Sequence, residues 1–376
     1  MKKSTLRWVP AIAVPALVVA GALTVPSMAN ASVNLPHKSA AGIVALAQKS
    51  AGTSFSGTIQ ETANLGLPDI SSSNLGGSSS GTANVLAELT GTHKANVFVS
   101  GSSSERIQTL DNLAEQDVIR TGKTIWAYDS KTNTATHVTL PDSTSSGQYQ
   151  SQSAQAQTPT EIATKALAEI GKYTTVATSS NVIVAGQKAY EITLTPKDSK
   201  TLVGDVTLAV DASTGVPLKA SITAKGQTNA ALSVQFTTIS YSKPSASTFA
   251  FTPPKGATVK TITVPSKSTS APSRLKHPGV TTQGQPTAGP AHRYSGTASK
   301  PVVLGSGWST VVGTTLTAKQ LKSIESSSIT NEVLTPVTGG KVLQTALVSI
   351  YLGDNGAVYV GAVSATDLEA AVAAQK

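Results

Sequence analysis

The stretch that decides the fold runs from Val118 to His137 and reads Val-Ile-Arg-Thr-Gly-Lys-Thr-Ile-Trp-Ala-Tyr-Asp-Ser-Lys-Thr-Asn-Thr-Ala-Thr-His. It predicts three short strands joined by two turns, over residues 118–120, 125–128 and 134–140. Gly122 and the polar run 129–133 supply the turns, because glycine and short polar side chains favour tight turns. Side chains alternate across a strand, so Trp126 and Tyr128 share one face. The stretch therefore predicts a meander of strands that curls around an apolar face.

The Gly-Lys-Thr-x-Trp-x-Tyr-Asp run that ends at Asp129 resembles a segment of the periplasmic lipoprotein carriers of the LolA type. Three further segments are similar to that family in the same order: 190–197, 210–218 and 249–259. The resemblance covers residues 35–259. It implies an unclosed β-barrel capped by helices, with an apolar cavity that holds acyl chains. The same fold occurs in the sensor domain of RseB-type anti-sigma regulators and in actinobacterial lipid-binding lipoproteins.

The composition excludes several classes of site. The 376 residues include no cysteine, so disulfides, thiolate nucleophiles, cysteine-metal sites and a lipid-modified N-terminal cysteine are all excluded. Only 13% of the residues are charged, so Ser, Thr, Gln and Asn must cover much of the surface.

Residues 1–31 have the pattern of a secretory signal peptide. A basic start with Lys2, Lys3 and Arg7 precedes an apolar run over 9–25, and Ala-Asn-Ala at 29–31 predicts cleavage before Ser32. An uncleaved membrane anchor is the alternative, although the run is short against the roughly 20 apolar residues that a span needs. We therefore expect a secreted, extracytoplasmic protein, in the periplasm or cell-envelope space.

Residues 35–259 predict an α+β domain, in which helices cap a curved antiparallel β-sheet that forms an unclosed barrel. An apolar stripe predicts a helix over 39–50, and Thr158 with Glu161 forms a capping box for a helix that begins at Pro159 and ends at Ile170. Residues 65–81 predict a loop folded onto an apolar surface. Alternating or apolar runs predict further strands over 54–63, 85–89, 94–100, 105–110, 182–184, 189–195, 205–211, 218–224 and 232–239.

Residues 260–300 predict a linker rich in Pro, Ser, Thr and Gly. The basic run already begins at Lys255, and it contains no acidic residue up to Lys300. One hypothesis is a tether attracted to an anionic membrane or cell-wall surface, and the other is a solvated spacer. Nucleic acid is not an expected partner, because the basic residues lack interleaved aromatic side chains.

Residues 301–376 predict a small α+β unit that resembles the C-terminal unit of RseB-like chains. The expected elements are a strand at 307–312, a helix capped by Thr317 and Gln320, strands at 341–352 and 357–363, and a last helix capped by Thr366 and Glu369. Asp354-Asn355-Gly356 predicts the turn between the last two strands.

No pattern predicts an enzyme, a cofactor or a metal site. The five histidines, His37, His93, His137, His277 and His292, lack ligand-type neighbours at helical spacing. Gly122-Lys123-Thr124 is not a phosphate loop, since Asp117 stands where its first glycine is required.

The strand predictions suggest eight residues as the lining of one apolar cavity between the sheet and the two large-domain helices: Phe55, Ile59, Phe98, Trp126, Tyr128, Leu194, Leu208 and Phe236. The resemblance implies an arginine at the mouth of this cavity, for which Arg106 and Arg120 are candidates. An error of one residue in register moves a side chain to the other face, so the face on which each of these residues lies depends on the register of its strand.

Three hypotheses follow. The first is an extracytoplasmic carrier of acyl chains of a lipid or lipoprotein. The second is an RseB-like sensor that regulates a membrane-bound anti-sigma factor through the C-terminal unit. The third is a secreted β-rich protein without a lipid ligand, in which Trp126 and Tyr128 are core.

Overall fold

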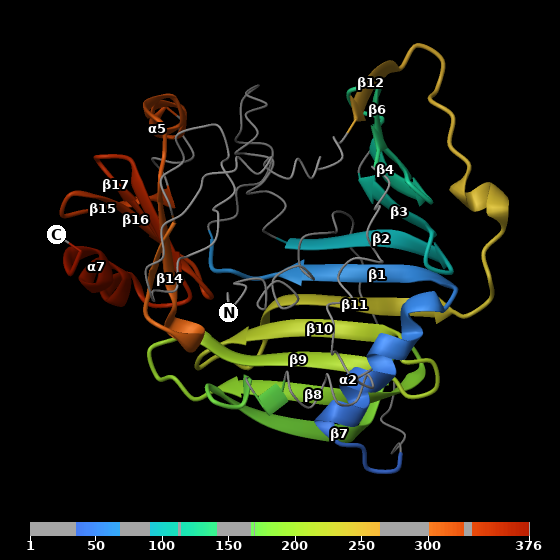
Figure 1. The fold of residues 1–376 in the computed structure, drawn as a ribbon, viewed down its shortest axis with the longest axis horizontal. Helices are drawn as coiled ribbons and strands as arrows, with labels where there is room; N and C mark the ends of the chain where they lie inside the picture. The colour runs from blue at the N-terminus through green and yellow to red at the C-terminus, as the bar shows by residue number, and fades with distance from the viewer. Residues whose placement is uncertain are drawn as a thin grey trace, which may run out of the picture.

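The computed structural model describes residues 35–67, 91–111, 114–140, 167–168, 170–263, 301–326 and 333–375. These residues form a large sheet of twelve strands and a small sheet of six strands (Figure 1). The predicted signal peptide, the strand expected at 85–89, most of the helix expected at 159–170 and most of the linker lie outside the described residues. Leu167, Ala168 and Ile170 of that helix are helical, and the Gly171 amide bonds the Leu167 carbonyl at its end.

The large sheet is an open, curved sheet whose strands run in the order β12-β6-β5-β4-β3-β2-β1-β11-β10-β9-β8-β7. Its pairings are antiparallel except that β12 runs parallel to β6, so the prediction of an unclosed, largely antiparallel barrel in an α+β fold is confirmed with one parallel edge. The strands are β1 Phe55–Ala63, β2 Gly91–Ser100, β3 Ser104–Asp111, β4 Ala114–Thr121, β5 Thr124–Asp129, β6 Thr134–Thr139, β7 Thr174–Val184, β8 Gln187–Pro196, β9 Val203–Asp211, β10 Pro217–Ala224, β11 Ala230–Ser240 and β12 Thr258–Thr263.

The expected end of the large domain at Val259 needs a correction. β12 continues to Thr263, and each residue from Thr258 onward has a partner in β6. The sequence predicted that residues 260–263 belong to the linker, because this segment is basic and rich in threonine. Backbone pairing with β6 nevertheless makes it the edge strand of the sheet.

Helix α2, Ala40–Lys49, packs across β7, β8 and β9, as Figure 1 shows. The Ser39 side chain caps it, and a short 3-10 helix, η3 Ser50–Gly52, follows. Its fully buried Ile43 meets Tyr190, Ile192 and Val210. The helix predicted over 39–50 is confirmed, and we call the sheet face beneath it the α2 face.

The strand registers define the two faces of the large sheet. Leu208, Ala220, Val234, Glu61 and His93 are successive cross-strand partners on the α2 face. The opposite, or reverse, face carries another row of successive partners: Phe98, Arg106, Ile119, Trp126 and His137. Ile59 is on the same face as Glu61, two residues away on β1, and its partner on β2 is Ala95. Ala95 and Phe98 are three residues apart on β2, and an odd separation puts side chains on opposite faces of a strand, so the two rows are on different faces.

The small domain is a sheet in the order β13-β14-β18-β17-β16-β15 with helix α7 on one face. The side chains packed against α7 include Val311, Tyr351 and Val363. Its elements are β13 Val302–Leu304, η5 Gly307–Ser309, β14 Val311–Thr315, α5 Ala318–Glu325, β15 Thr335–Val337, β16 Gly340–Gln344, β17 Ser349–Gly353, β18 Ala357–Gly361 and α7 Ala365–Ala373.

The small domain confirms two turn-and-cap predictions and corrects three others. Thr317 and Gln320 form the expected capping box, and Asp354–Gly356 joins β17 to β18. The expected strand at 307–312 begins as a 3-10 helix, and the run 341–352 is split into β16 and β17 by a turn in which Thr345 bonds Val348. The last helix is capped by Ser364 instead of Thr366, since the Ser364 hydroxyl accepts the Asp367 amide.

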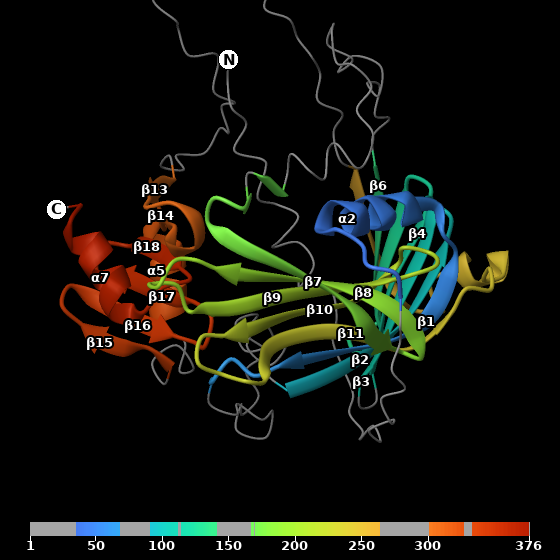
Figure 2. The ribbon, with the colours of Figure 1, turned by 90° about the horizontal axis from the view of Figure 1, so that it is seen from below.

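The small domain docks on one end of the large sheet (Figure 2). Leu347 and Trp308 pack against Val203, Ile222 and Leu232 of the large sheet. The Trp308 indole Nε1 donates to Thr174 Oγ1 at 2.8 Å. Backbone pairing between Leu202 and Ala362, at 2.8 Å, adds a second attachment. Apolar packing and directed hydrogen bonds therefore join the two domains.

Candidate functional site

The two halves of the large sheet differ in which faces they bury. On β1, β2 and β11 the buried residues include Ile59, Val97 and Phe236 on the α2 face, while Ala189 and Ala209 are buried on the reverse face of β8 and β9. On β4 and β6 the buried residues are Asp117, Ile119 and Ala135, which belong to the reverse face. Among the described residues, the α2 face of β4 and β6 is therefore the less buried of the two faces.

This open part of the α2 face is aliphatic. Val118 on β4 is 38% exposed and Ile262 on β12 is 51% exposed. Ile107, Ile125 and Val138 are half-buried on the same face. Direct pairing links Ile125 to Val138 and Val138 to Ile262, so the row crosses three strands without a break. We call Ile107, Val118, Ile125, Val138 and Ile262 the open apolar face.

The reverse face of β3–β6 is covered by the segment that follows β11. This segment contains η4, Ala246–Phe249, which packs against β3 and β4. The Phe251 ring lies 5.4 Å from the Trp126 ring and 5.6 Å from the Tyr128 ring, measured between centroids. Trp126 also stacks on His137 at 4.5 Å. Both aromatic residues are therefore packed against the chain's own covering segment.

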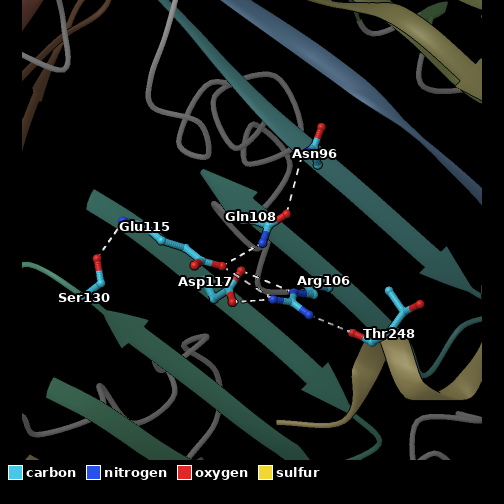
Figure 3. A network of polar contacts seen from close by, with 7 residues as sticks. All are labelled: Asn96, Arg106, Gln108, Glu115, Asp117, Ser130 and Thr248. Atoms are coloured by element: carbon cyan, nitrogen blue, oxygen red, sulfur yellow. Dashed lines mark hydrogen bonds and ion pairs between the residues drawn. The ribbon is translucent and has the colours of Figure 1, made fainter. Parts of the chain in front are cut away.

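A polar cluster holds η4 in place on this reverse face (Figure 3). Arg106 pairs with the buried carboxylate of Asp117 and donates from Nη1 to the Thr248 carbonyl oxygen at 3.2 Å. Burial raises the pKa of Asp117 above its usual value, although the Arg106 guanidinium acts in the opposite direction. Gln108 extends the cluster, since it donates to Glu115 at 2.6 Å and accepts from Asn96 at 3.4 Å.

The eight residues expected to line one cavity lie in three places. Phe55, Ile59 and Phe236 belong to one apolar cluster on the α2 face, with the two phenyl rings 5.7 Å apart. Leu194 and Leu208 lie on the same face but under α2, packed with Ile43. The other three residues, Phe98, Trp126 and Tyr128, are on the reverse face.

The physical reason for this division is register. Alternation within one strand predicts that Trp126 and Tyr128 are on the same face of that strand. It does not determine which face of the whole sheet this is. The pairing of β2 with β1 and of β4 with β5 decides that.

The two candidate arginines are also on opposite faces. Arg106 is on the reverse face in the ion pair with Asp117. Arg120 is on the α2 face, where its direct partners are Glu105 and Ile125. Its Nε donates to the Gly122 carbonyl oxygen at 3.2 Å. Of the two, only Arg120 borders the open apolar face.

Sequence reasoning selected none of the five residues of the open apolar face. Val118 and Ile125 were inside predicted strands but were not selected as lining residues. The larger side chains of Trp126 and Tyr128 were selected instead, and these are on the other face. Ile262 was missed because it lies in a segment with linker-like composition. The β-branched residues in the run Thr258-Val259-Lys260-Thr261-Ile262-Thr263 were a local signal for β12.

The small domain has an exposed apolar row of its own. Val303, Val312 and Val360 are direct partners on β13, β14 and β18, and they are 62%, 45% and 37% exposed. Alternation places them on the face opposite to Val311, which packs under α7.

Within the described ranges, no group of three or more His, Asp or Glu side chains is placed to hold a metal ion. The helices that the structure describes also fall short of the length and apolar character needed to cross a membrane.

No family model matches the chain, and no curated protein matches its sequence. Solved structures do match. A chain of the Pseudomonas aeruginosa MucA/MucB complex is similar at 16% identity and a TM-score of 0.41, with 88% of this chain and 96% of that chain covered.

Two further structures match a smaller share of the chain. An uncharacterized conserved protein from Thermus thermophilus has 11% identity and a TM-score of 0.34, covering 58% of this chain and 97% of its own. A LolA superfamily protein from Nitrosomonas europaea has 12% identity and a TM-score of 0.24, covering 57% and 99%. All three TM-scores are below 0.5, and the resemblance to the LolA-like and RseB-like superfamily stays a prediction.

Proposed function

We propose that this protein is an extracytoplasmic carrier that binds acyl chains of a lipid or lipoprotein along the open apolar face. The observation that carries the proposal is the exposure of Val118 and Ile262 in one aliphatic row with Ile125 and Val138. Soluble proteins seldom leave a continuous aliphatic surface open unless something binds there. The predicted signal peptide supports an extracytoplasmic location.

Acyl-chain burial supplies the driving force. Each methylene removed from water contributes about 0.8 kcal/mol, so a chain of about sixteen carbons needs apolar surroundings worth on the order of 10 kcal/mol. The open apolar face covers one side of such a chain and adjoins the cluster of Ile59 and Phe236. A surface that covers the chain only in part also eases release to an acceptor.

Two measurements test the carrier proposal. Native mass spectrometry of the exported protein is expected to find a co-purified lipid, and a fluorescent fatty acid is expected to bind saturably to the delipidated protein. If neither bound lipid nor saturable binding is found, the third hypothesis holds, a secreted β-rich protein without a lipid ligand.

A regulatory function is the second candidate, and the valine row favours it. Val303, Val312 and Val360 offer an exposed apolar surface on a domain that is firmly joined to the large sheet. In this alternative a membrane-bound regulator of the anti-sigma type contacts the small domain. Site-specific cross-linking from position 312 in cells tests it. A membrane protein captured in the wild type and lost in Val303→Glu supports regulation, whereas no capture leaves the carrier function alone.

A further inference from the structure

The small domain contains a cavity of about 280 Å³ between α7 and the sheet on which this helix packs. Tyr351 on β17 forms one wall, and Thr338, in the turn between β15 and β16, borders the cavity. The other lining residues are on the last turns of α7: Glu369, Ala370, Val372 and Ala373. An apolar cavity of about 150 Å³ already holds a benzene molecule. This cavity therefore has room for a planar group on a short alkyl stem.

The hydroxyl group of Tyr351 offers this cavity an acceptor. Tyr351 is 4% exposed, and its hydroxyl donates to the Gly339 carbonyl oxygen at 2.8 Å. Burial raises the pKa of Tyr351 above its ordinary value, and the negative charges of Asp354 and Glu369 raise it further. The hydroxyl is therefore protonated at neutral pH. Its single proton is used inside the protein, so its oxygen is able to accept a hydrogen bond but the group has no second proton to donate.

Glu369 brings a carboxylate to the cavity. It is half-buried, and within the described part of the chain it has neither a hydrogen bond nor an ion pair. None of the lining residues is basic. Lys341 on β16 is next to Val342, the direct partner of Tyr351, so alternation places Lys341 on the opposite face of the small sheet. The lining thus leaves the charge of Glu369 without a counter-charge.

The C-terminal end of α7 adds to this negative potential. The helix ends at Ala373, which lines the cavity, and its last turn contains no basic residue. The free carbonyl groups at the C-terminal end of a helix carry a partial negative charge, which a nearby cation stabilises. The carboxylate of Glu369 and the end of α7 therefore favour the same kind of ligand.

We propose that this cavity binds a cation on a short alkyl stem, a guanidinium or ammonium group such as an arginine or lysine side chain carries. Ala370, Val372 and Ala373 pack against the stem, and Glu369 pairs with the cation. A guanidinium has five N–H donors in one plane, so it is able to meet the carboxylate and the Tyr351 hydroxyl oxygen together. The site is separate from the open apolar face and does not depend on the carrier function.

The test compares three probes of similar length: n-butylguanidinium, pentanamide and pentanoate, which are positive, neutral and negative. Binding to the full chain at neutral pH is followed by NMR of protein labelled at its valine methyl groups, through the signals of Val372. Butylguanidinium is expected to shift these signals saturably and to bind about fivefold or more tightly than pentanamide, whereas pentanoate is expected not to bind. Glu369→Gln keeps the shape and removes the charge, so it is expected to reduce butylguanidinium binding to the level of pentanamide.

Glu191→Gln is the matched control, because it makes the same change of charge on β8 of the large sheet. It is expected to bind butylguanidinium as the wild type does. Thermal unfolding of each variant shows whether it is folded before binding is compared. The peptide Ac-Ala-Arg-Ala-NH2 distinguishes the source of the cation. Tighter binding of the peptide than of butylguanidinium supports a polypeptide side chain as the ligand, and weaker binding supports a free cation.

Two results would overturn the proposal in the wild type alone. One is the absence of a saturable shift with butylguanidinium, and the other is equal affinity for the three probes. A folded Glu369→Gln variant that keeps the wild-type affinity would also overturn it, because the carboxylate would then have no part in binding. The wild-type comparison decides the matter even if Glu369→Gln does not fold.

Discussion

The guanidinium of Arg106 donates two hydrogen bonds to the carboxylate of Asp117, with Nε 3.3 Å from Oδ1 and Nη2 2.6 Å from Oδ2. Asp117 is only 3% exposed, so this pair is a bidentate contact in a largely dry setting. Arg106 also reaches the Thr248 carbonyl oxygen in η4. The pair thus joins the sheet to the segment that covers its reverse face, and it has no part in the open apolar face.

Arg106→Leu is expected to destabilise the protein by about 3–5 kcal/mol, because it leaves the buried Asp117 carboxylate without its partner. Urea unfolding monitored by tryptophan fluorescence measures the loss. Arg120→Leu is the control on the neighbouring strand, and its expected cost is about 1 kcal/mol or less, since Arg120 has no ion pair among the contacts of the described residues. Equal costs for both variants would show that the Asp117 pair is not what stabilises the reverse face.

Asp211→Ala is expected to cost about 1.5–3 kcal/mol at neutral pH, because hydrogen bonds to a charged acceptor are lost. Asp211 Oδ1 accepts from the Ser213 and Thr214 amides, at 2.9 Å and 2.7 Å, and from both hydroxyls. Asp129→Ala is the control, since Asp129 makes a similar turn with the Lys131 amide at 2.8 Å but lies nearer the surface. The control is expected to cost less in the same urea unfolding assay.

The cost of Asp211→Ala is also expected to depend on pH. Burial alone would raise the pKa of Asp211, but the hydrogen bonds from Ser213 and Thr214 outweigh it and hold the pKa below 3.8. The stabilisation by the Asp211 carboxylate is therefore fully present above the pKa that Asp211 has in the unfolded chain. It is lost as pH falls from about 4 through the lower pKa that Asp211 has in the folded protein. Urea unfolding at several pH values is expected to show the wild-type advantage shrinking only in that acidic range. An advantage that grows on acidification would contradict the assignment.

Ile262→Glu is expected to weaken binding of a fluorescent fatty acid by about tenfold or more, because it puts a charge on the open apolar face. Val259→Glu on the same strand is a closely matched control. The two side chains are 51% and 50% exposed, yet Ile262 pairs with Val138 on the α2 face and Val259 with Ala135 on the reverse face. Both variants are expected to stay folded. Equal binding losses in the two variants would remove the open apolar face as the acyl-chain site.

Trp308→Ala is expected to loosen the small domain from the large sheet. It removes the hydrogen bond to Thr174 and part of the apolar contact with Val203, a loss on the order of 2 kcal/mol. Differential scanning calorimetry is expected to show the small domain unfolding earlier, as a separate transition. Trp126→Ala, the same change inside the large domain, is expected to lower the main transition and leave the domains joined. A single unsplit transition in Trp308→Ala would argue against this role of Trp308.

Local patterns in the sequence were sufficient for the secondary structure of many elements. The apolar stripe after Ser39, the alternation around Val206–Val210 and the Asp354-Asn355-Gly356 turn each depend on residues close together in the chain, and each is present as predicted. Capping was less certain, because Ser364 and Thr366 are both able to start the last helix. The fold class followed from the same local patterns together with the order of the motifs.

Which face of each strand is buried was decided only by the tertiary structure. Trp126 and Tyr128 share a face by alternation, and that face is covered because Phe251, far away in the sequence, packs against both rings. Val118, on the adjacent strand, is left open for the same reason. The role of 260–263 likewise depends on pairing with β6. Alternation has a period of two residues and carries no information about which side is covered, so only contacts between distant segments decide which side is covered and which stays exposed.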